Sequence, residues 1–105
     1  MLKRKLIWSP QSKIELLEIL EYYKKRNGNA NYSRKLYTEI KELLEICRTY
    51  SFIGKQTDFE NVRMLIVDIF LIFYEVDDNK LIVLTIWNSK RNPNDLTKPH
   101  ERKTY

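Results

Sequence analysis

The sequence contains few of the residues that cross-link a chain or interrupt regular structure. Among its 105 residues are two glycines, three prolines, one cysteine and one histidine. A lone cysteine cannot form an intrachain disulfide, no zinc-ligand spacing is present, and two glycines cannot build a glycine-rich phosphate loop. We therefore expect regular elements joined by short connections, a Cys47 that only packs in the core, and no metal or other cofactor.

Long apolar runs are also missing. No segment approaches the roughly 18 consecutive apolar residues of a membrane span, and the apolar part of the opening MLKRKLIWSP is too short for a secretory signal. The sequence therefore predicts a cytoplasmic protein with no membrane partner. With 43% hydrophobic and 31% charged residues, the chain suits one globular domain over residues 1–105, in which 97–105 form a flexible tail.

The charge is unbalanced toward the basic side. Lysine and arginine number 19 against 14 aspartates and glutamates, which gives a net charge of +5 at pH 7. A basic surface favours an anionic partner such as nucleic acid, a ribosome or an acidic protein, although many basic domains bind none of these. Charge alone therefore does not select a function.

The first half of the chain has two helical patterns after a short strand. Alternation over residues 3–9 predicts the strand, Ser9-Pro10 fits the N-cap and first position of a helix, and Asn27-Gly28 ends that helix. A second helix is predicted over residues 30–50, and the short connection favours an antiparallel helical hairpin. The expected apolar positions are Leu16, Ile19, Leu20 and Tyr23, widened by Ile14 and Leu17, in the first helix, and Leu36, Ile40, Leu43, Leu44 and Cys47 in the second.

The second half has the composition of strands. The run VRMLIVDIFLIFYEV (62–76) is too long for one strand and predicts a β-hairpin that reverses at Asp68. A turn at residues 77–79 precedes the last strand, KLIVLTIW (80–87). The predicted fold class is α+β, in the order strand, helix, helix, strand, strand, strand. The helical hairpin covers one face of a three-stranded antiparallel sheet.

Groups suited to catalysis are scarce. His100 is the single histidine, and it has no second histidine or cysteine with which to form a metal site or a nucleophile–base pair. The carboxylates of Asp77 and Asp78 are explained by the turn that they form. The sequence therefore predicts no catalytic residue.

Several cationic and aromatic residues near strand ends are candidates for binding. Arg63 either lies at a sheet edge or points to a functional face. Lys90 and Arg91, beside Asn88, can hold phosphates or clamp carboxylates, or they form a solvated turn. Trp87 is either a core residue or a platform on which bases stack.

Together these segments resemble the RelE/ParE superfamily of toxins from bacterial type II toxin–antitoxin systems. The resemblance rests on Trp8-Ser9-Pro10 after the opening strand, the helical hairpin, Val62-Arg63 at the start of the sheet run, IFLIFYEV (69–76) and VLTIWNSKRNP (83–93). It implies a toxin neutralised by an acidic-tailed antitoxin, which places an amphipathic helix in a groove and a strand on a sheet edge. It also implies that DNA is bound only through the antitoxin.

The superfamily contains two activities. Its RelE-like members cleave mRNA in the ribosome and have an arginine where this chain has Leu71. They also supply an acid or base after the last strand, where this chain has Asn92, Pro93 and Asn94, and only a distant group such as Tyr105 remains. ParE-like members bind DNA gyrase and trap it on cleaved DNA.

These departures favour a ParE-like, plasmid-stabilising toxin that binds gyrase and has no chemistry of its own. A RelE-like ribosome-dependent endoribonuclease and an inactive homologue that acts only as a binding module are the alternatives. The residues expected to bind the target or the antitoxin are Arg63, Trp87, Asn88, Lys90 and Arg91. Under the RelE-like alternative, Arg63, Lys90 and Arg91 would instead supply cations for catalysis.

Overall fold

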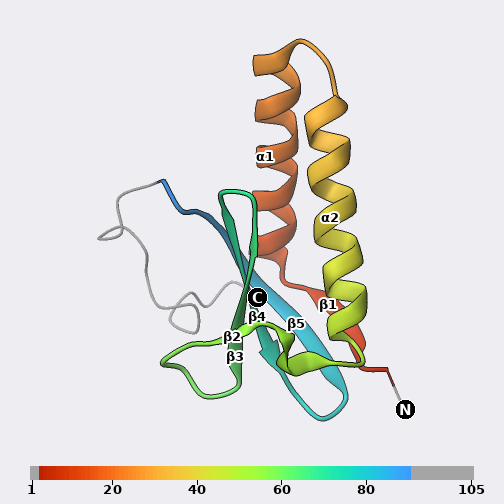
Figure 1. The fold of residues 1–105 in the computed structure, drawn as a ribbon, viewed down its shortest axis with the longest axis vertical. Helices are drawn as coiled ribbons and strands as arrows, with labels where there is room; N and C mark the ends of the chain where they lie inside the picture. The colour runs from red at the N-terminus through yellow and green to blue at the C-terminus, as the bar shows by residue number, and fades with distance from the viewer. Residues whose placement is uncertain (1–2, 91–105) are drawn as a thin grey trace.

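The computed structural model describes residues 3–90, in which a hairpin of two helices packs on one face of a single sheet (Figure 1). Along the chain the elements are β1 (Lys5–Trp8), α1 (Pro10–Asn27), α2 (Asn31–Cys47), a 3-10 turn (Ser51–Ile53), β2 (Lys55–Gln56), β3 (Val62–Val67), β4 (Phe70–Val76) and β5 (Lys80–Asn88). The predicted α+β fold and the order of its main elements are confirmed. None of the described helices is long and apolar enough to cross a membrane.

The sheet has five strands in the order β1-β5-β4-β3-β2. The expected three-stranded antiparallel unit is present as β3, β4 and β5, and one further strand joins each of its edges. β1 pairs with β5 in parallel, in a register from Lys5 opposite Lys80 to Trp8 opposite Val83. The two-residue β2 pairs with β3 in the connection between α2 and β3, where no strand was predicted from the sequence.

The helix and turn boundaries follow the local signals. The Ser9 side chain accepts a hydrogen bond from the backbone N–H of Ser12, Pro10 occupies the first turn, and Gly28 ends α1 in the left-handed region at φ 73°. The β3–β4 hairpin reverses at Asp68, whose φ is 55°. The Tyr32 hydroxyl donates a 2.6 Å hydrogen bond to the Asp68 carboxylate, and this bond ties the start of α2 to the hairpin.

The main core lies between the helices and the sheet. From α2 it includes Leu36, Ile40, Leu44 and the fully buried Cys47, whose thiol pKa is raised by burial. A second, smaller cluster packs the side chains of Val62, Phe73, Leu84 and Trp87, which lie on the opposite face of the sheet. The sheet is therefore apolar on both faces.

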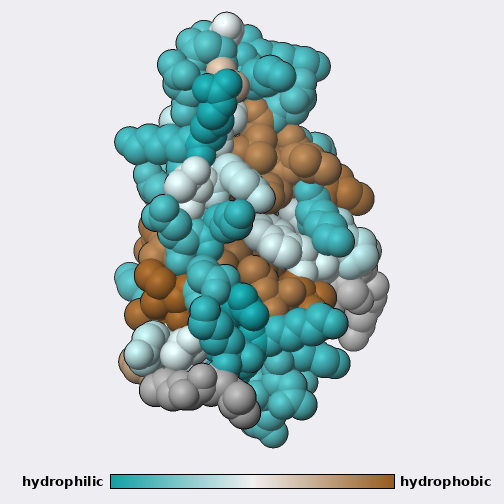
Figure 2. All heavy atoms as spheres, turned by 90° about the vertical axis from the view of Figure 1, so that its right-hand side faces the viewer, coloured by the Kyte–Doolittle hydropathy of each residue, from teal (hydrophilic) through white to brown (hydrophobic). Residues whose placement is uncertain are grey.

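One prediction about the first helix was wrong. Ile14 and Leu17 were expected to widen the buried apolar face of α1, but their side chains are 58% and 65% exposed. α1 packs mainly against α2 and β5, and the exposure of these two residues places them largely outside those contacts. Figure 2 shows hydrophobic patches bordered by hydrophilic side chains on the side of the molecule that carries α2.

Candidate interaction surface

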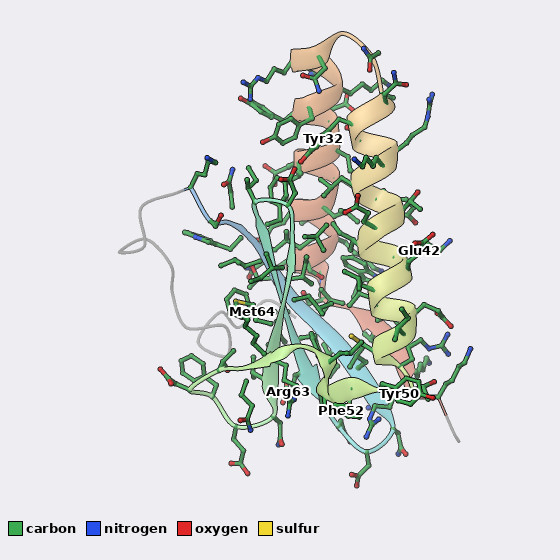
Figure 3. All side chains as sticks on the ribbon, viewed as in Figure 1. Tyr32, Glu42, Tyr50, Phe52, Arg63 and Met64 are labelled. Atoms are coloured by element: carbon green, nitrogen blue, oxygen red, sulfur yellow. The ribbon has the colours of Figure 1, made fainter. Side chains whose placement is uncertain are left out.

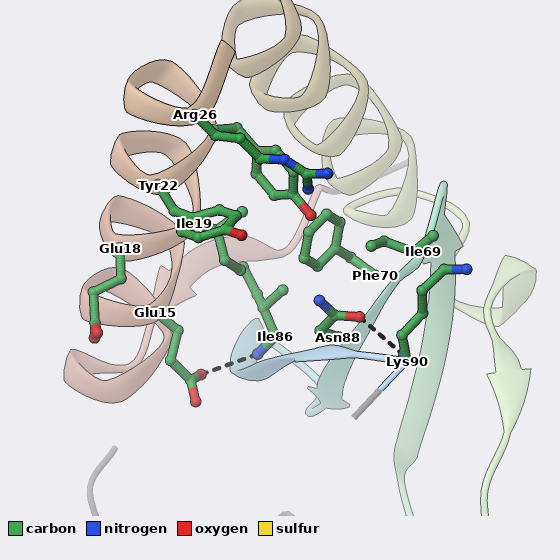
Figure 4. A pocket seen from close by; sticks show the side chains of 11 residues that line it. Glu15, Glu18, Ile19, Tyr22, Arg26, Ile69, Phe70, Ile86, Asn88 and Lys90 are labelled. Atoms are coloured by element: carbon green, nitrogen blue, oxygen red, sulfur yellow. Dashed lines mark hydrogen bonds between the residues drawn. The ribbon is translucent and has the colours of Figure 1, made fainter. Parts of the chain in front are cut away.

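A groove of about 820 Å³ lies between α1, the start of β4 and the end of β5 (Figure 4). Its apolar lining comes from both layers of the fold. Polar and charged groups surround that lining, at the point where β5 ends. The lining residues include Glu15, Ile19, Arg26, Phe70, Asn88 and Lys90.

Side chains of α1 take the place of a neighbouring strand along one part of β5. The strand β1 ends at Trp8, opposite Val83, so the next residues of β5 lack a paired backbone on that side. The Ser9 hydroxyl donates to the Leu84 carbonyl at 3.0 Å. Farther along, a Glu15 carboxylate oxygen accepts the Ile86 N–H at 3.0 Å. The N-cap residue Ser9 and Glu15 of α1 thus provide hydrogen-bond partners for backbone groups at the edge of β5, which would otherwise need water.

The double role of Ser9 makes it a sensitive position. Its hydroxyl caps α1 by accepting the Ser12 N–H at 3.0 Å and at the same time satisfies the Leu84 carbonyl. We expect Ser9→Ala to lower the free energy of unfolding by about 2 kcal/mol, because a helix cap and a buried hydrogen bond are lost together. Urea denaturation checks this, with the exposed Ser89→Ala as the control that should change stability little.

Beyond Ile86 the edge of β5 is open. The Ser89 N–H donates to the Ile69 carbonyl at 2.8 Å. Because antiparallel pairs alternate, the N–H and C=O of the preceding residue, Asn88, point away from β4 and toward the groove. The same alternation explains why the Ile86 N–H reaches Glu15. Within residues 3–90 no strand pairs with this stretch.

Cations lie beside the open edge. Arg26 comes from the last turn of α1, and Lys90 follows the end of β5. Figure 4 shows them on the side of the groove away from Glu18. Neither cation forms an ion pair with another described residue, since the two ion pairs in residues 3–90 both use Glu45. The groove therefore offers backbone hydrogen-bonding groups, an apolar surface, two cations without an ion-pair partner among residues 3–90, and the carboxylates of Glu15 and Glu18.

The structure brings together only some of the residues predicted from the sequence. Asn88 and Lys90 both line the groove, and the Asn88 side-chain oxygen accepts the Lys90 N–H at 2.9 Å. Trp87 points to the other face of the sheet, where it is 5% exposed within the smaller apolar cluster. Arg91 lies outside the described residues, as do His100 and Tyr105. A binding role for Asn88, Lys90, Trp87, Arg91 and Arg63 remains a prediction.

Arg63 lies at the opposite end of the sheet from Lys90. It is the second residue of β3 and lies opposite Tyr74. Its guanidinium Nη1 donates to the carbonyls of Phe52, at 3.0 Å, and Gly54, at 2.7 Å. Figure 3 shows Arg63 beside the segment that carries Phe52. The structure thus gives Arg63 a role in holding that loop, in addition to any contact with a partner.

Glu15 and Arg26 were not predicted as site residues from the sequence. A signal for Glu15 was present, because Ser9, Ser12 and Glu15 recur at spacings of three on one side of the helix, among apolar neighbours. Nothing local indicated that Arg26 would meet the end of a strand more than sixty residues later. Within residues 3–90 no three His, Cys, Asp or Glu side chains come close enough to hold a metal ion. The groove beside the open edge of β5 is suited to binding an extended peptide.

Comparisons with known proteins agree with the fold. A family model described as the ParE toxin of the type II toxin–antitoxin system, parDE, matches residues 6–93. A solved structure described as the chromosomal ParDE TA system from P. aeruginosa is similar, with a TM-score of 0.71 and 18% sequence identity over 84% of this chain and 98% of that chain. At that identity the likeness concerns the fold. No curated protein matches the chain.

Proposed function

Because the chain belongs to the ParE toxin family of type II toxin–antitoxin systems, we propose that it arrests bacterial growth by binding DNA gyrase and trapping it on cleaved DNA. A cognate antitoxin with an acidic tail neutralises it. DNA is bound only through that antitoxin, and both proteins act in the cytoplasm. Where the two genes are carried on a plasmid, a daughter cell that loses the plasmid also loses its supply of antitoxin and is poisoned by the remaining toxin. The pair would thereby stabilise plasmid inheritance.

The surroundings of Leu71 carry the preference for binding over RNA cleavage. RelE-like ribonucleases resemble this chain but have an arginine at that place. Here Leu71 lies between Ile66 and Trp87 on the neighbouring strands and packs against the smaller apolar cluster. Cleavage of a phosphodiester needs cations at the developing charge together with an acid and a base. An apolar surface at this position supports a binding role instead.

The surface proposed to meet gyrase or the antitoxin is the exit of β5, with Asn88, Lys90 and Arg91. Trp87 supports it from the opposite face, and Arg63 orders the far end of the sheet. Lys90 has no ion-pair partner in residues 3–90, so its charge is free to meet a carboxylate or a phosphate. The net charge of +5 favours an acidic partner in general.

Pulse-labelling of DNA and protein synthesis, minutes after this chain alone is induced in bacteria, tests the proposal. We expect DNA synthesis to fall first, and purified gyrase with the chain to accumulate cleaved DNA. Replacing Lys90 and Arg91 together by alanine should weaken both effects. Lys80→Ala, at the other end of the same strand, is the control that should not.

Other results would contradict the proposal in distinct ways. If protein synthesis falls first and mRNA is cut in translating ribosomes, the chain is a ribonuclease despite Leu71. If neither synthesis falls while an antitoxin still binds, the chain is an inactive homologue that acts only as a binding module.

A further inference from the structure

We infer that the last part of this chain, residues 91–105, covers the face of the sheet that the helices leave open. That face carries the smaller apolar cluster of Val62, Phe73, Leu84 and Trp87. The proposed cover is a contact of the chain with itself, so it does not depend on the proposed function. It determines whether Trp87 and its neighbours are open to a partner.

The burial of this face provides the first reason. Both helices pack on the other face (Figure 1), and the smaller apolar cluster includes no helix residue. Nevertheless, Leu84 is 2% exposed, Trp87 5% and Phe73 6%. Ile66, which lies beside Leu71 at the edge of the same face, is 50% exposed. Neighbouring side chains shield one another only from the sides, so burial this complete needs a second layer above the three central side chains.

The described residues provide that layer at one end only. Phe59, just before β3, packs against the cluster beside Val62, whose N–H donates to the Phe59 carbonyl at 3.2 Å. Trp87 lies at the other end, because it pairs with Leu71 and Leu71 pairs with Ile66, roughly 13 Å along β3 from Val62. The atoms above Trp87 therefore have to come from residues outside 3–90.

The positions and lengths of the two chain ends outside residues 3–90 select residues 91–105 as the cover. Residues 1–2 precede β1, whose Lys5 pairs with Lys80, at the end of β5 that is roughly 23 Å from Trp87. Residues 91–105 begin directly after Lys90, three positions beyond Trp87. Extended, they can reach roughly 50 Å, whereas five strands are roughly 19 Å across. This end of the chain therefore starts close to Trp87 and is long enough to cross the sheet.

The composition of residues 91–105 suits a cover. Leu96 is the single aliphatic residue among them, and Pro93, Pro99 and Tyr105 provide further apolar surface. Proline has no N–H to donate, so two prolines favour packing across the face over pairing as an added strand. The remaining residues are polar or charged, as expected for a segment with one side in water. Leu96 is thus the side chain that we expect to hold the cover on the apolar cluster.

Charge supports the same placement. Residues 91–105 contain four Lys or Arg and two Asp or Glu. At the Val62 end of the face lie Glu75, which pairs with Val62, and Asp58 and Glu60 in the preceding connection. None of these three carboxylates forms an ion pair with another described residue. A basic segment that crosses the face from Trp87 would approach them, which stabilises the covered state modestly.

The test measures thiol reactivity in the full chain. Leu84→Cys places a probe thiol under the proposed cover, and the native Cys47, fully buried beneath the helices, reports opening of the main core in the same molecule. Modification by a water-soluble thiol reagent, followed by peptide mass mapping, separates the two thiols. We expect both to be protected, and the probe thiol alone to become reactive when the cover is weakened.

Two changes weaken the cover, and a third is the control. Leu96→Asp should raise the reaction rate of the probe thiol about tenfold, the factor expected when a buried leucine no longer holds the segment in place. A chain that ends at Lys90 should react at least as fast. Thr97→Asp adds the same charge at the neighbouring position and should change the rate little. Cys47 should stay protected in all three, which shows that the main core is folded.

Fast reaction of the probe thiol in the full chain would overturn the inference, because the face would then be open. The same rate with and without Leu96→Asp and in the shortened chain would also overturn it, and protection lost on dilution would assign the cover to a second copy of the chain. If Cys47 became reactive in the shortened chain, that chain would be unfolded, and the full-length comparison of Leu96→Asp with Thr97→Asp would decide. None of these measurements involves gyrase, so the inference and the proposed function can fail separately.

Discussion

Trp87→Ala is expected to lower the free energy of unfolding by about 3–5 kcal/mol, the usual effect of removing a buried aromatic side chain. Trp87 is 5% exposed and packs in the apolar cluster with Val62, Phe73 and Leu84. The residue on the neighbouring strand opposite it is Leu71. A cavity at this place would loosen the packing of β4 and β5. Chemical denaturation followed by the fluorescence of Trp8 measures the loss.

A second substitution at this position, Trp87→Phe, separates the two roles that the sequence left open for Trp87. Trp87→Phe should keep most of the stability, because it fills much of the same space. It should also keep growth inhibition if Trp87 acts only through packing. A folded Trp87→Phe variant that binds neither gyrase nor antitoxin would instead identify the indole as a contact surface.

Local signals in the sequence were sufficient for the boundaries of most elements. Ser9-Pro10 predicted the start of α1 because capping depends on residues a few positions apart, and the structure has that cap. Gly28 and Asp68 both lie at positive φ, where the predicted helix end and hairpin reversal require it. These features depend on short-range sterics and hydrogen bonds, which a single sequence contains.

Features that depend on distant segments were not predictable in the same way. The parallel pairing of β1 with β5 joins residues separated by the whole helical hairpin, and no local pattern specifies it. The strand β2 has only two residues, too few for an alternating pattern. Its position follows from its pairing with β3.

The candidate site shows the same division. Asn88 and Lys90 could be named from composition at a strand end, and both line the groove. The contribution of Arg26 could not be named, because it depends on how the end of α1 packs beside β5. Arg63 was predicted only as a candidate for binding, which stays a prediction. Its hydrogen bonds to two backbone carbonyls depend on a loop whose path no short-range pattern defines.

Gly54→Ala is expected to lower the free energy of unfolding by about 3 kcal/mol, mainly by overpacking. The backbone of Gly54 is ordinary, with φ −70° and ψ 155°, so conformational freedom is not why glycine is needed. A Cβ there would lie 2.7 Å from Cε1 of Tyr74. Tyr74 is fully buried and cannot move aside without breaking the bonds that its hydroxyl makes.

Those bonds clamp the loop from two sides. The Tyr74 hydroxyl accepts the Gly54 N–H at 2.9 Å and donates to the Ser51 carbonyl at 2.7 Å. Burial raises the pKa of Tyr74, so its proton remains available for that donation. Arg63 completes the clamp through the Phe52 and Gly54 carbonyls. Displacing Tyr74 would therefore also release the arginine.

Gly28→Ala provides the matched comparison for Gly54→Ala. A Cβ at Gly28 would meet no atom within 4 Å, so only its positive φ of 73° is penalised, at about 1 kcal/mol. Thermal or urea unfolding of the two variants should rank Gly54→Ala as clearly the more destabilised. If the two variants lost equal amounts of unfolding free energy, the loop that carries Gly54 would be moving to make room for the new methyl group. That loop would then no longer fix Arg63. Its guanidinium would then be available to a partner, as the sequence first suggested.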